Sequence, residues 1–295
     1  MYQDHWKLVR RPFEPRVNPR WFFGSVHHRG AIVALQSLVA RHEPFAALAA
    51  GPGYGKTMVA AVLADILPAE TPAVSVHTIA DTAREAFADL LLGLGRLIPE
   101  CCDGRNVGDR DADELMSAAR ANLAAAAMTN RRPVVLLDAI DSLPDVELRR
   151  FLDAIRSIEP RATQRLSVIL LGSSDLVMRL RRLADAAVPP FPQILLGSLA
   201  PADVAGYVSH CVRLAGGDPS IFEPRAVELI ADLSGGIPRR INRLCDLSLL
   251  VAYSHNSLSV SESHVWTAQR ENRVLSATRS GTSPRPHAWR QLTRI

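Results

Sequence analysis

The sequence contains very little lysine: only Lys7 and Lys56 are lysines among its 34 basic residues. It also lacks long apolar runs, since no uninterrupted apolar stretch reaches the roughly 18 residues that a membrane-spanning helix needs. The opening residues, MYQDHWKLVRR, have no apolar region of the kind found in signal peptides. We therefore expect no membrane span and a cytoplasmic location.

Cysteine is also scarce, and the excess of positive charge is small. The cysteines show no metal-ligand spacing, and in a reducing compartment we interpret the adjacent pair as incidental rather than as a disulfide. The doublet His27–His28 has no Cys or carboxylate cluster near it in sequence, so we predict no metal site there. A net charge of +4 does not by itself argue for a nucleic-acid partner. The cysteines are Cys101, Cys102, Cys211 and Cys245.

The most informative stretch is FAALAAGPGYGKT, at residues 45–57. A short apolar run enters a glycine-rich turn, which leads to Lys56, Thr57 and an alanine-rich helical pattern. This strand–loop–helix order is what a phosphate-binding P-loop needs. Successive backbone N–H groups of such a turn form a nest around phosphate, and the following helix adds the positive end of its dipole. The alternative interpretation is a glycine-rich surface turn without a ligand.

The motif assigns a role to each polar side chain. Lys56 is predicted to reach the β- and γ-phosphates of ATP, and the Thr57 hydroxyl to hold Mg²⁺. In an arginine-rich chain, a lysine stands where a compact ammonium is needed and a planar guanidinium does not fit. The first motif position is Ala50 instead of glycine, and we expect a small residue to be tolerated there. The predicted cofactor-binding residues of this loop and helix are Ala50, Gly51, Pro52, Gly53, Tyr54, Gly55, Lys56, Thr57 and Met58.

Strand and helix patterns alternate through the first two thirds of the chain, which predicts an α/β sheet that is mostly parallel. The predicted strands are 45–49, 73–77, 133–138, 166–171 and 193–196. Between them we predict helices at 81–97, 114–128, 145–158 and 176–184, with a loop at 99–113. After residue 199 only helical patterns remain, at 201–215, 223–233, 238–253 and 261–272.

With the P-loop after the first strand, these patterns predict a P-loop NTPase fold: a three-layer α/β/α parallel sheet followed by a small all-helical lid domain. We expect an N-terminal segment at 1–35, the ATPase domain at 36–198, the lid at 199–272 and a tail at 273–295. The tail carries five arginines and no acids, with several Ser, Thr, Gly and Pro residues, and is predicted to be disordered.

Three further segments supply candidates for the nucleotide site. The apolar strand PVVLLD ends in Asp138, the expected Walker B acid, which would hold Mg²⁺ through water. The next strand ends LLGSSD, so Ser173 or Ser174 would lie near the γ-phosphate, although an ordinary strand-end turn explains these serines equally well. In GGIPRRINRL, Arg239 stands at the start of a helix and would touch the γ-phosphate if the lid covers the sheet edge. The competing interpretation is a solvated basic face made by Arg239 and Arg240.

Motifs at both ends of the chain carry a family resemblance. The opening segment contains Pro12-Phe13, then Arg20 to Phe22, then Ser25 and His28; the lid contains Tyr207-Val208, His210 and SGGIPRRINRLCDLSLL. On these motifs, residues 1–272 resemble the AAA+ ATPases of the general secretion pathway protein A group, which are akin to ATPase regulators of target selection in transposition. The resemblance implies the AAA+/RecA-like form of this fold, ATP and Mg²⁺ as ligands, a homo-oligomer and a protein partner. It also implies that the N-terminal segment, with Phe13, wraps the adenine side of the nucleotide.

The sequence departs from that group at the catalytic acid. The group's Walker B motif ends Asp-Glu, whereas here Asp138 is followed by Ala139. That glutamate polarises the attacking water, and loss of a general base costs about 10²- to 10⁴-fold in rate. Asp141, three residues further on, is the candidate replacement. A smaller departure is Tyr54, at a P-loop position that is often small in the group.

A second departure concerns the arginine that the group offers to the neighbouring subunit's γ-phosphate shortly before the last strand. No arginine lies between Arg182 and Arg213 in this sequence. Arg179, Arg181 and Arg182 stand earlier and are the conceivable replacements. An arginine finger is worth about 10³ to 10⁵ in turnover.

The predicted catalytic set is Lys56, Asp138, Arg239 and Asp141, with Thr57 and Asp138 as metal-holding residues. Because binding groups are kept while two hydrolytic groups are missing, we expect slow or partner-dependent hydrolysis in a nucleotide-dependent switch or regulator of a partner assembly. The secretion relatives add a membrane span and a wall-binding module after the ATPase, and neither follows here, so we expect a soluble regulator.

Two alternatives remain. One is a DNA-binding ATPase of the transposition-regulator type, whose basic tail contacts the phosphate backbone; the tail is otherwise a solvated segment. The other is a non-hydrolysing scaffold in which nucleotide only stabilises the fold. The tail residues concerned are Arg273, Arg279, Arg285, Trp289, Arg290 and Arg294.

Overall fold

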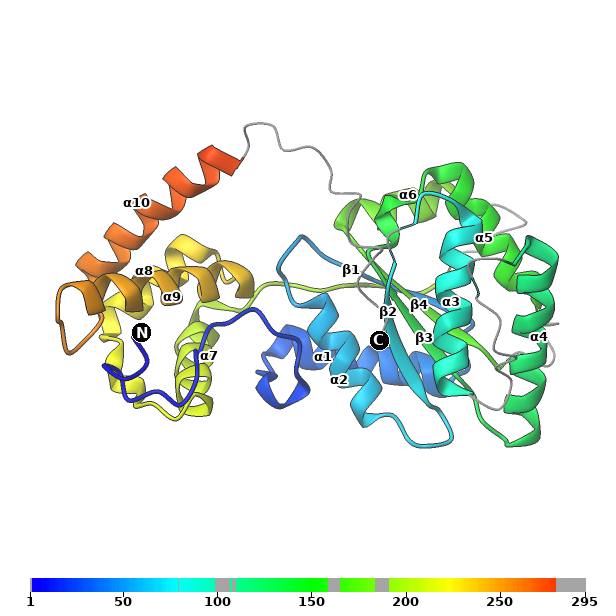
Figure 1. The fold of residues 1–295 in the computed structure, drawn as a ribbon, viewed down its shortest axis with the longest axis horizontal. Coiled ribbons are helices and arrows are strands. Elements are labelled where there is room, and N and C mark those ends of the chain that lie inside the picture. The colour runs from blue at the N-terminus through cyan, green and yellow to red at the C-terminus, as the bar shows by residue number, and fades with distance from the viewer. Residues whose placement is uncertain are drawn as a thin grey trace. The chain divides into compact units, whose positions relative to one another are not determined.

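The computed structural model describes residues 2–78, 80–98, 107, 110–158, 165–183 and 191–279. The chain divides into two compact units (Figure 1). Pro15–Ala200 together with Ile237–Arg239 form the α/β unit. The residues up to Glu14, Pro201–Gly236 and the described residues from Arg240 on form the helical unit.

The described part of the α/β unit contains a five-stranded sheet in the order β2-β3-β4-β1-β5, with every neighbouring pair parallel. The strands are β1 (Phe45–Ala49), β2 (Ala73–His77), β3 (Val134–Asp138), β4 (Ser167–Gly172) and β5 (Gln193–Leu195). In the register, Ala49 lies opposite Gly172, and Asp138 lies opposite Leu171. The loops that follow β1, β3 and β4 therefore leave the same edge of the sheet, where ligands of open α/β sheets bind.

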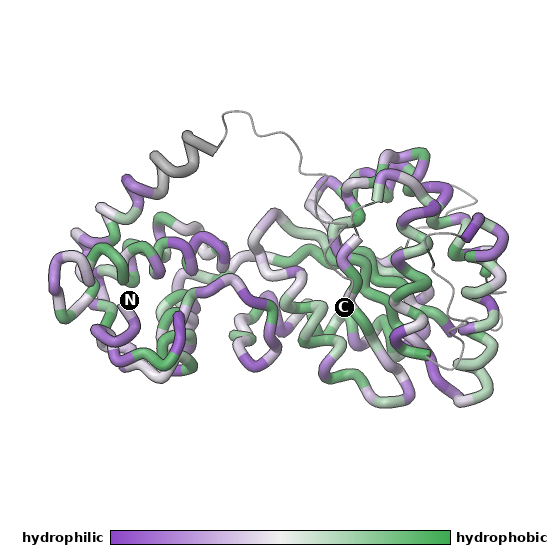
Figure 2. The backbone as a smooth tube through the Cα atoms, in the orientation of Figure 1, coloured by the Kyte–Doolittle hydropathy of each residue, from purple (hydrophilic) through white to green (hydrophobic). Residues whose placement is uncertain are grey.

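Helices cover both faces of this sheet. One face carries α1 (Val26–Ala40) and α2 (Lys56–Ile66), and the other carries α3 (Ala83–Leu97), α4 (Ala112–Met128), α5 (Asp145–Ile158) and α6 (Ser174–Leu183). Because successive strand side chains point to opposite faces, Phe45 packs into the α3–α6 cluster and its neighbour Ala46 into the α1–α2 cluster. Strands β1, β3 and β4 are buried along their whole length, and Figure 2 shows the sheet as a hydrophobic layer. The predicted three-layer α/β/α arrangement is confirmed.

The helical unit consists of α7 (Pro201–Leu214), α8 (Pro224–Ser234), α9 (Pro238–Ser254) from Arg240 on, and α10 (Glu262–Arg279). The N-terminal residues belong to its core, since Tyr2, Trp6 and Phe13 are all buried. The Tyr2 hydroxyl donates to Asp246 at 2.5 Å, and the Trp6 indole donates to the Leu249 carbonyl at 3.4 Å. Short 3₁₀ turns at Pro19–Trp21, Ile140–Ser142 (η4) and Pro219–Ile221 complete the described elements.

The predicted elements appear in the predicted order and type, several with ends shifted by one or two residues, and the structure adds α1, which begins within the predicted N-terminal segment. Helix α4 begins at Ala112, inside the predicted loop, because Asp111 and Glu114 form a reciprocal capping box. Helix α10 continues to Arg279, so the prediction of disorder from residue 273 is wrong for 273–279, a stretch that contains good helix formers such as Leu275 and Ala277. Most of the predicted loop, the pair Cys101–Cys102 and the tail from residue 280 lie outside the described residues.

Candidate functional site

The loop between β1 and α2 has the backbone of a phosphate cradle. Gly53 and Gly55 have φ of +86° and +99°, a region that side chains other than glycine rarely adopt. Ala50 has no positive φ, and its N–H donates to the Gly172 carbonyl at 3.1 Å. The backbone therefore requires glycine at the two later positions and not at Ala50, the position where the motif departs from its usual form.

The Lys56 ammonium lies against this loop, where it donates to the carbonyls of Ala50 at 2.9 Å and Gly51 at 3.3 Å. Burial lowers the pKa of Lys56 from its ordinary value, and the negative charges of Asp138 and Asp141 oppose that shift. A positive charge with only weak carbonyl partners in a half-buried loop is well placed to exchange them for phosphate oxygens.

Thr57 and Asp138 meet across the sheet edge. The Thr57 hydroxyl donates to Asp138 Oδ2 at 2.5 Å, and the Ala139 N–H donates to Asp138 Oδ1 at 2.9 Å. Hydroxyl and carboxylate oxygens suit Mg²⁺, which usually takes one or two protein ligands and completes its shell with water and substrate phosphates. The described residues contain no group of three or more His, Cys, Asp or Glu side chains able to hold a metal, and the candidate protein oxygens for Mg²⁺ are those of Thr57 and Asp138. The pair therefore fits Mg²⁺, which when bound would neutralise part of the phosphate charge.

The residue after Asp138 brings no acid to the site. Ala139 adopts a left-handed conformation with φ of 66° and leads into η4, which contains Asp141. Asp141 Oδ2 accepts a hydrogen bond of 2.6 Å from the Ser173 N–H, while Oδ1 is buried with no hydrogen-bond partner among the described residues. A Cβ on Gly172 would lie 2.1 Å from Oδ1, so only glycine leaves room for this carboxylate.

Burial raises the pKa of Asp141 above its ordinary value, although the Ser173 N–H and the charges of Lys56 and Arg179 oppose that rise. Asp141 thus has a raised pKa, a carboxylate oxygen without a hydrogen-bond partner among the described residues, and an electrostatic interaction with Lys56. Groups of this kind are typical of functional sites.

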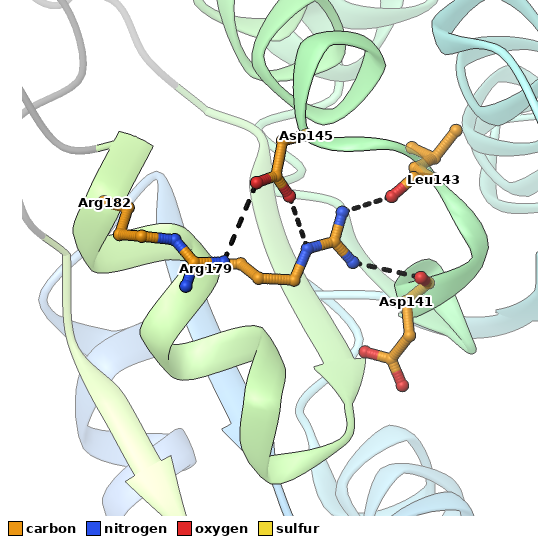
Figure 3. Close-up of polar contacts among 5 residues, drawn as sticks. All are labelled: Asp141, Leu143, Asp145, Arg179 and Arg182. Atoms are coloured by element: carbon orange, nitrogen blue, oxygen red, sulfur yellow. Dashed lines mark hydrogen bonds and ion pairs between the residues drawn. The ribbon is translucent and has the colours of Figure 1, made fainter.

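Arg179 of α6 fixes the loop that carries Asp141 (Figure 3). Its Nε donates to Asp145 Oδ1 at 2.6 Å, one terminal nitrogen donates to the Asp141 carbonyl at 3.0 Å, and the other donates to the Leu143 carbonyl. The side chain is only 11% exposed. All three donor nitrogens of Arg179 are thus engaged within one unit, whereas Arg182 is 62% exposed and lies 3.7 Å from Asp145 Oδ2.

Comparisons with known proteins agree with this geometry. Residues 39–180 match the family model of the AAA domain. Over 275 residues the chain is 29% identical to general secretion pathway protein A of Aeromonas hydrophila, a match that covers 92% of this chain and 48% of the relative. Residues 39–180 are therefore an AAA domain, and the chain resembles the AAA+ proteins of the general secretion pathway protein A group. It spans about half the length of that relative.

The AAA+ fold also appears in solved structures with low sequence identity. The ORC2 protein of Aeropyrum pernix matches with a TM-score of 0.66 and 17% identity, covering 94% of this chain and 73% of that one. The Cdc6p protein of Pyrobaculum aerophilum matches with a TM-score of 0.66 and 16% identity, over 88% of this chain and 70% of that one. The RuvB Holliday junction branch migration motor of Thermotoga maritima matches with a TM-score of 0.52 and 17% identity, over 88% and 73%. These likenesses show the fold alone.

Three further predicted site residues lie in different places: one follows β4, one lies against the P-loop and one lies in the helical unit. Ser173 uses its backbone N–H to hold Asp141. Arg239 lies in the stretch that groups with the α/β unit, and its N–H donates to the Gly53 carbonyl at 3.2 Å. The Phe13 ring is 2% exposed and packs edge-on against Phe222, 5.8 Å between centroids, inside the helical unit. Their roles toward nucleotide remain predictions.

Tyr54 and Met58 are two further residues that were predicted to bind the nucleotide. A Cβ on Gly51 would lie 2.8 Å from Cε2 of Tyr54, so the tyrosine ring folds back over its own loop. The Met58 side chain is partly buried against the α1–α2 cluster, and its role toward nucleotide stays a prediction.

One contact was missed by the sequence analysis. His28 Nε2 lies 2.8 Å from the Tyr54 carbonyl in the P-loop, and His28 Nδ1 lies 2.7 Å from the Ser25 hydroxyl. The Ser25 and His28 motif was recognised as part of the N-terminal signature, but its spacing carries no sign of where the ring points. Separately, no helix in the described part of the chain is both long and apolar enough to cross a membrane.

Proposed function

We propose that this protein binds Mg-ATP at the P-loop and uses the nucleotide as a switch, with hydrolysis that is slow or depends on a partner. The observation that carries the proposal is the convergence of Lys56, Thr57 and Asp138 around a loop whose glycines have positive φ. These groups supply phosphate binding and metal binding, the two requirements for holding a nucleoside triphosphate.

The slow hydrolysis follows from the residue at position 139. An alanine methyl cannot accept a proton or orient water, so the polarising role falls to another group. Asp141 follows Ala139 by two residues, one of its carboxylate oxygens has no hydrogen-bond partner among the described residues, and the charge of Lys56 acts on it. In this proposal Asp141 orients or deprotonates the attacking water, and Lys56 holds the transferred phosphoryl group.

The switch is proposed to act on a protein assembly. A nucleotide held by one unit of an AAA+ protein and released after hydrolysis changes which conformations are stable, and partners that distinguish those conformations respond. The exposed Arg182 and its neighbour Arg181 are candidates to supply positive charge to a second copy, because Arg179 is engaged elsewhere.

Equilibrium binding of Mg-ATP by isothermal titration calorimetry tests the proposal. We expect Lys56→Ala to weaken binding by at least 100-fold, because the only ammonium in the loop is removed. Lys7→Asn is the matched control: it removes the other lysine, and asparagine tolerates the positive φ of 52° at that position. Wild-type protein that shows no affinity for adenine nucleotides, or Lys56→Ala protein that binds like wild type, would contradict the proposal.

We do not advance the DNA-binding alternative. It depends on the basic tail, of which Arg273 and Arg279 lie in α10 while the remaining arginines lie outside the described residues. Its test is separate: DNA affinity that falls steeply with salt, and less steeply once residues 280–295 are removed, would favour it.

A further inference from the structure

We propose that His28 is a positioning residue for the nucleotide, one that holds the P-loop in its phosphate-binding conformation before ATP arrives. The inference rests on the proposed function of this loop. Its basis is a side-chain bond from the first turn of α1 to the backbone of the P-loop, between residues 26 positions apart in the sequence. His28 is 4% exposed and Ser25 is 2% exposed, so both side chains are largely shielded from water.

The partners of His28 indicate which tautomer its neutral ring adopts. The Tyr54 carbonyl is only an acceptor, so the nearby Nε2 carries the hydrogen and donates it. In the neutral ring Nδ1 is then the acceptor, and the Ser25 hydroxyl donates to it at 2.7 Å. The hydrogen bond from Ser25 thus favours the tautomer whose Nε2–H donates to the Tyr54 carbonyl of the P-loop.

Holding the Tyr54 carbonyl also orients the next amide. The peptide bond between Tyr54 and Gly55 is trans, so its C=O and N–H point in opposite directions. With the carbonyl turned toward His28, the Gly55 N–H is directed away from His28, as a P-loop donor to phosphate must be. Gly55 itself has φ of +99°, and a Cβ there would lie 3.0 Å from His28 Nε2.

Capping of α1 does not account for this ring. The Ser25 side chain already caps the helix by accepting the His28 backbone N–H, a bond that any residue at position 28 retains. The imidazole adds a hydrogen bond to a residue outside α1, the Tyr54 carbonyl. The neighbouring His27 has a different target, since its Nδ1 lies 2.7 Å from the Ser198 carbonyl. His27 therefore offers a control on the same helical turn.

The experiment measures binding of Mg-ADP and of a non-hydrolysable ATP analogue to the full chain by calorimetry. His28→Leu keeps apolar volume and removes the donor, so we expect about tenfold weaker binding, because the partly buried Tyr54 carbonyl loses its partner. His28→Gln places an amide donor near the position of Nε2, and we expect recovery to within about threefold of wild type. His27→Ala is expected to stay within about twofold.

Each result supports or overturns the inference. Binding by His28→Leu equal to wild type overturns it, and so does equal weakening in His28→Leu and His28→Gln, because then the donor is not what matters. If His28→Leu does not fold, His28→Gln and Ser25→Ala decide, and Ser25→Ala should weaken binding by about threefold through loss of the tautomer constraint. Lack of nucleotide binding by wild type would instead refute the proposed function, an outcome that the Lys56→Ala comparison identifies separately.

Discussion

At the scale of single residues, Asp141 decides how this site can work without a glutamate after Asp138. Burial raises the pKa of Asp141, and a general base acts only when ionised. The acid limb of kcat/KM for ATP hydrolysis should therefore rise with pH through a value above the ordinary Asp pKa of about 4. Steady-state rates measured from pH 4 to 8 give this limb, because kcat/KM reports the free enzyme.

Asp141→Asn supplies the control for that profile. The amide oxygen can still accept from the Ser173 N–H, so the loop keeps this bond while the base is lost. We expect turnover to fall by about 100-fold and the acid limb to disappear, with ATP affinity little changed. An unchanged profile in Asp141→Asn would assign the limb to another group.

Ala139 offers the complementary test, in which the missing acid is restored. Ala139→Glu should raise turnover by about 100-fold if loss of the general base limits hydrolysis. The left-handed φ of 66° is already present for alanine, so glutamate adds little further backbone strain. Ala139→Gln has the same length without the carboxylate and should show no gain. Equal effects of Glu and Gln in a phosphate-release assay would mean that size, and not the acid, matters.

At the scale of elements, Arg179 joins α6 to the segment between β3 and α5. Its three bonds satisfy two backbone carbonyls and one carboxylate beneath a side chain that is 11% exposed. Hydrogen bonds of charged groups contribute about 1.5–3 kcal/mol each, and part of this is regained from water on mutation. We expect Arg179→Gln to lower the free energy of unfolding by about 2 kcal/mol in urea titrations and to lower turnover, because Asp141 loses its support.

Arg182→Gln is the matched control for Arg179. It removes the same charge from the same helix, but its side chain is 62% exposed and its ion pair with Asp145 is 3.7 Å long. Exposed pairs of this kind contribute about 0–1 kcal/mol. Similar losses of stability in both variants would show that α6 charge, and not the buried bonds, stabilises the segment.

The elements of this site differ in how far sequence predicts them. The P-loop and the Walker B strand were predicted because their residues lie together in the chain and their patterns have few other uses. The bond from Asp141 to Ser173 joins residues 32 positions apart, and it exists only because β3 and β4 are parallel neighbours. His28 and Arg179 were missed as site supports because each binds the site through backbone carbonyls, which leave no mark in the sequence. The capping box of Asp111 and Glu114 was visible and would have placed the start of α4.

At the scale of the whole molecule, the chain begins in the helical unit, continues into the α/β unit and then returns to the helical unit. The residues up to Glu14 join the helical unit, and the segment Pro15–Ala200 is inserted between them and the rest of that unit. Burial of large aromatic side chains explains why the N-terminus joins this unit, since Tyr2, Trp6 and Phe13 are each no more than 5% exposed. The helical unit therefore depends on residues that are nearly 200 positions distant from its helices.

Phe13 is a core residue of the helical unit in the structure and an adenine contact according to the family resemblance, and the variant Phe13→Ala distinguishes these two roles. As a core residue packed on Phe222, its replacement in Phe13→Ala should lower the free energy of unfolding of the helical unit by about 3–5 kcal/mol, through loss of burial and creation of a cavity. Hydrogen exchange with mass spectrometry, read at peptides of α7, α8 and α9, should show faster opening there than in β1 and β4. Val9→Ala, at a side chain that is 76% exposed, is the control and should change exchange little. Weaker ATP binding by Phe13→Ala with unchanged exchange in the helical unit would instead favour the adenine contact that the family resemblance implies.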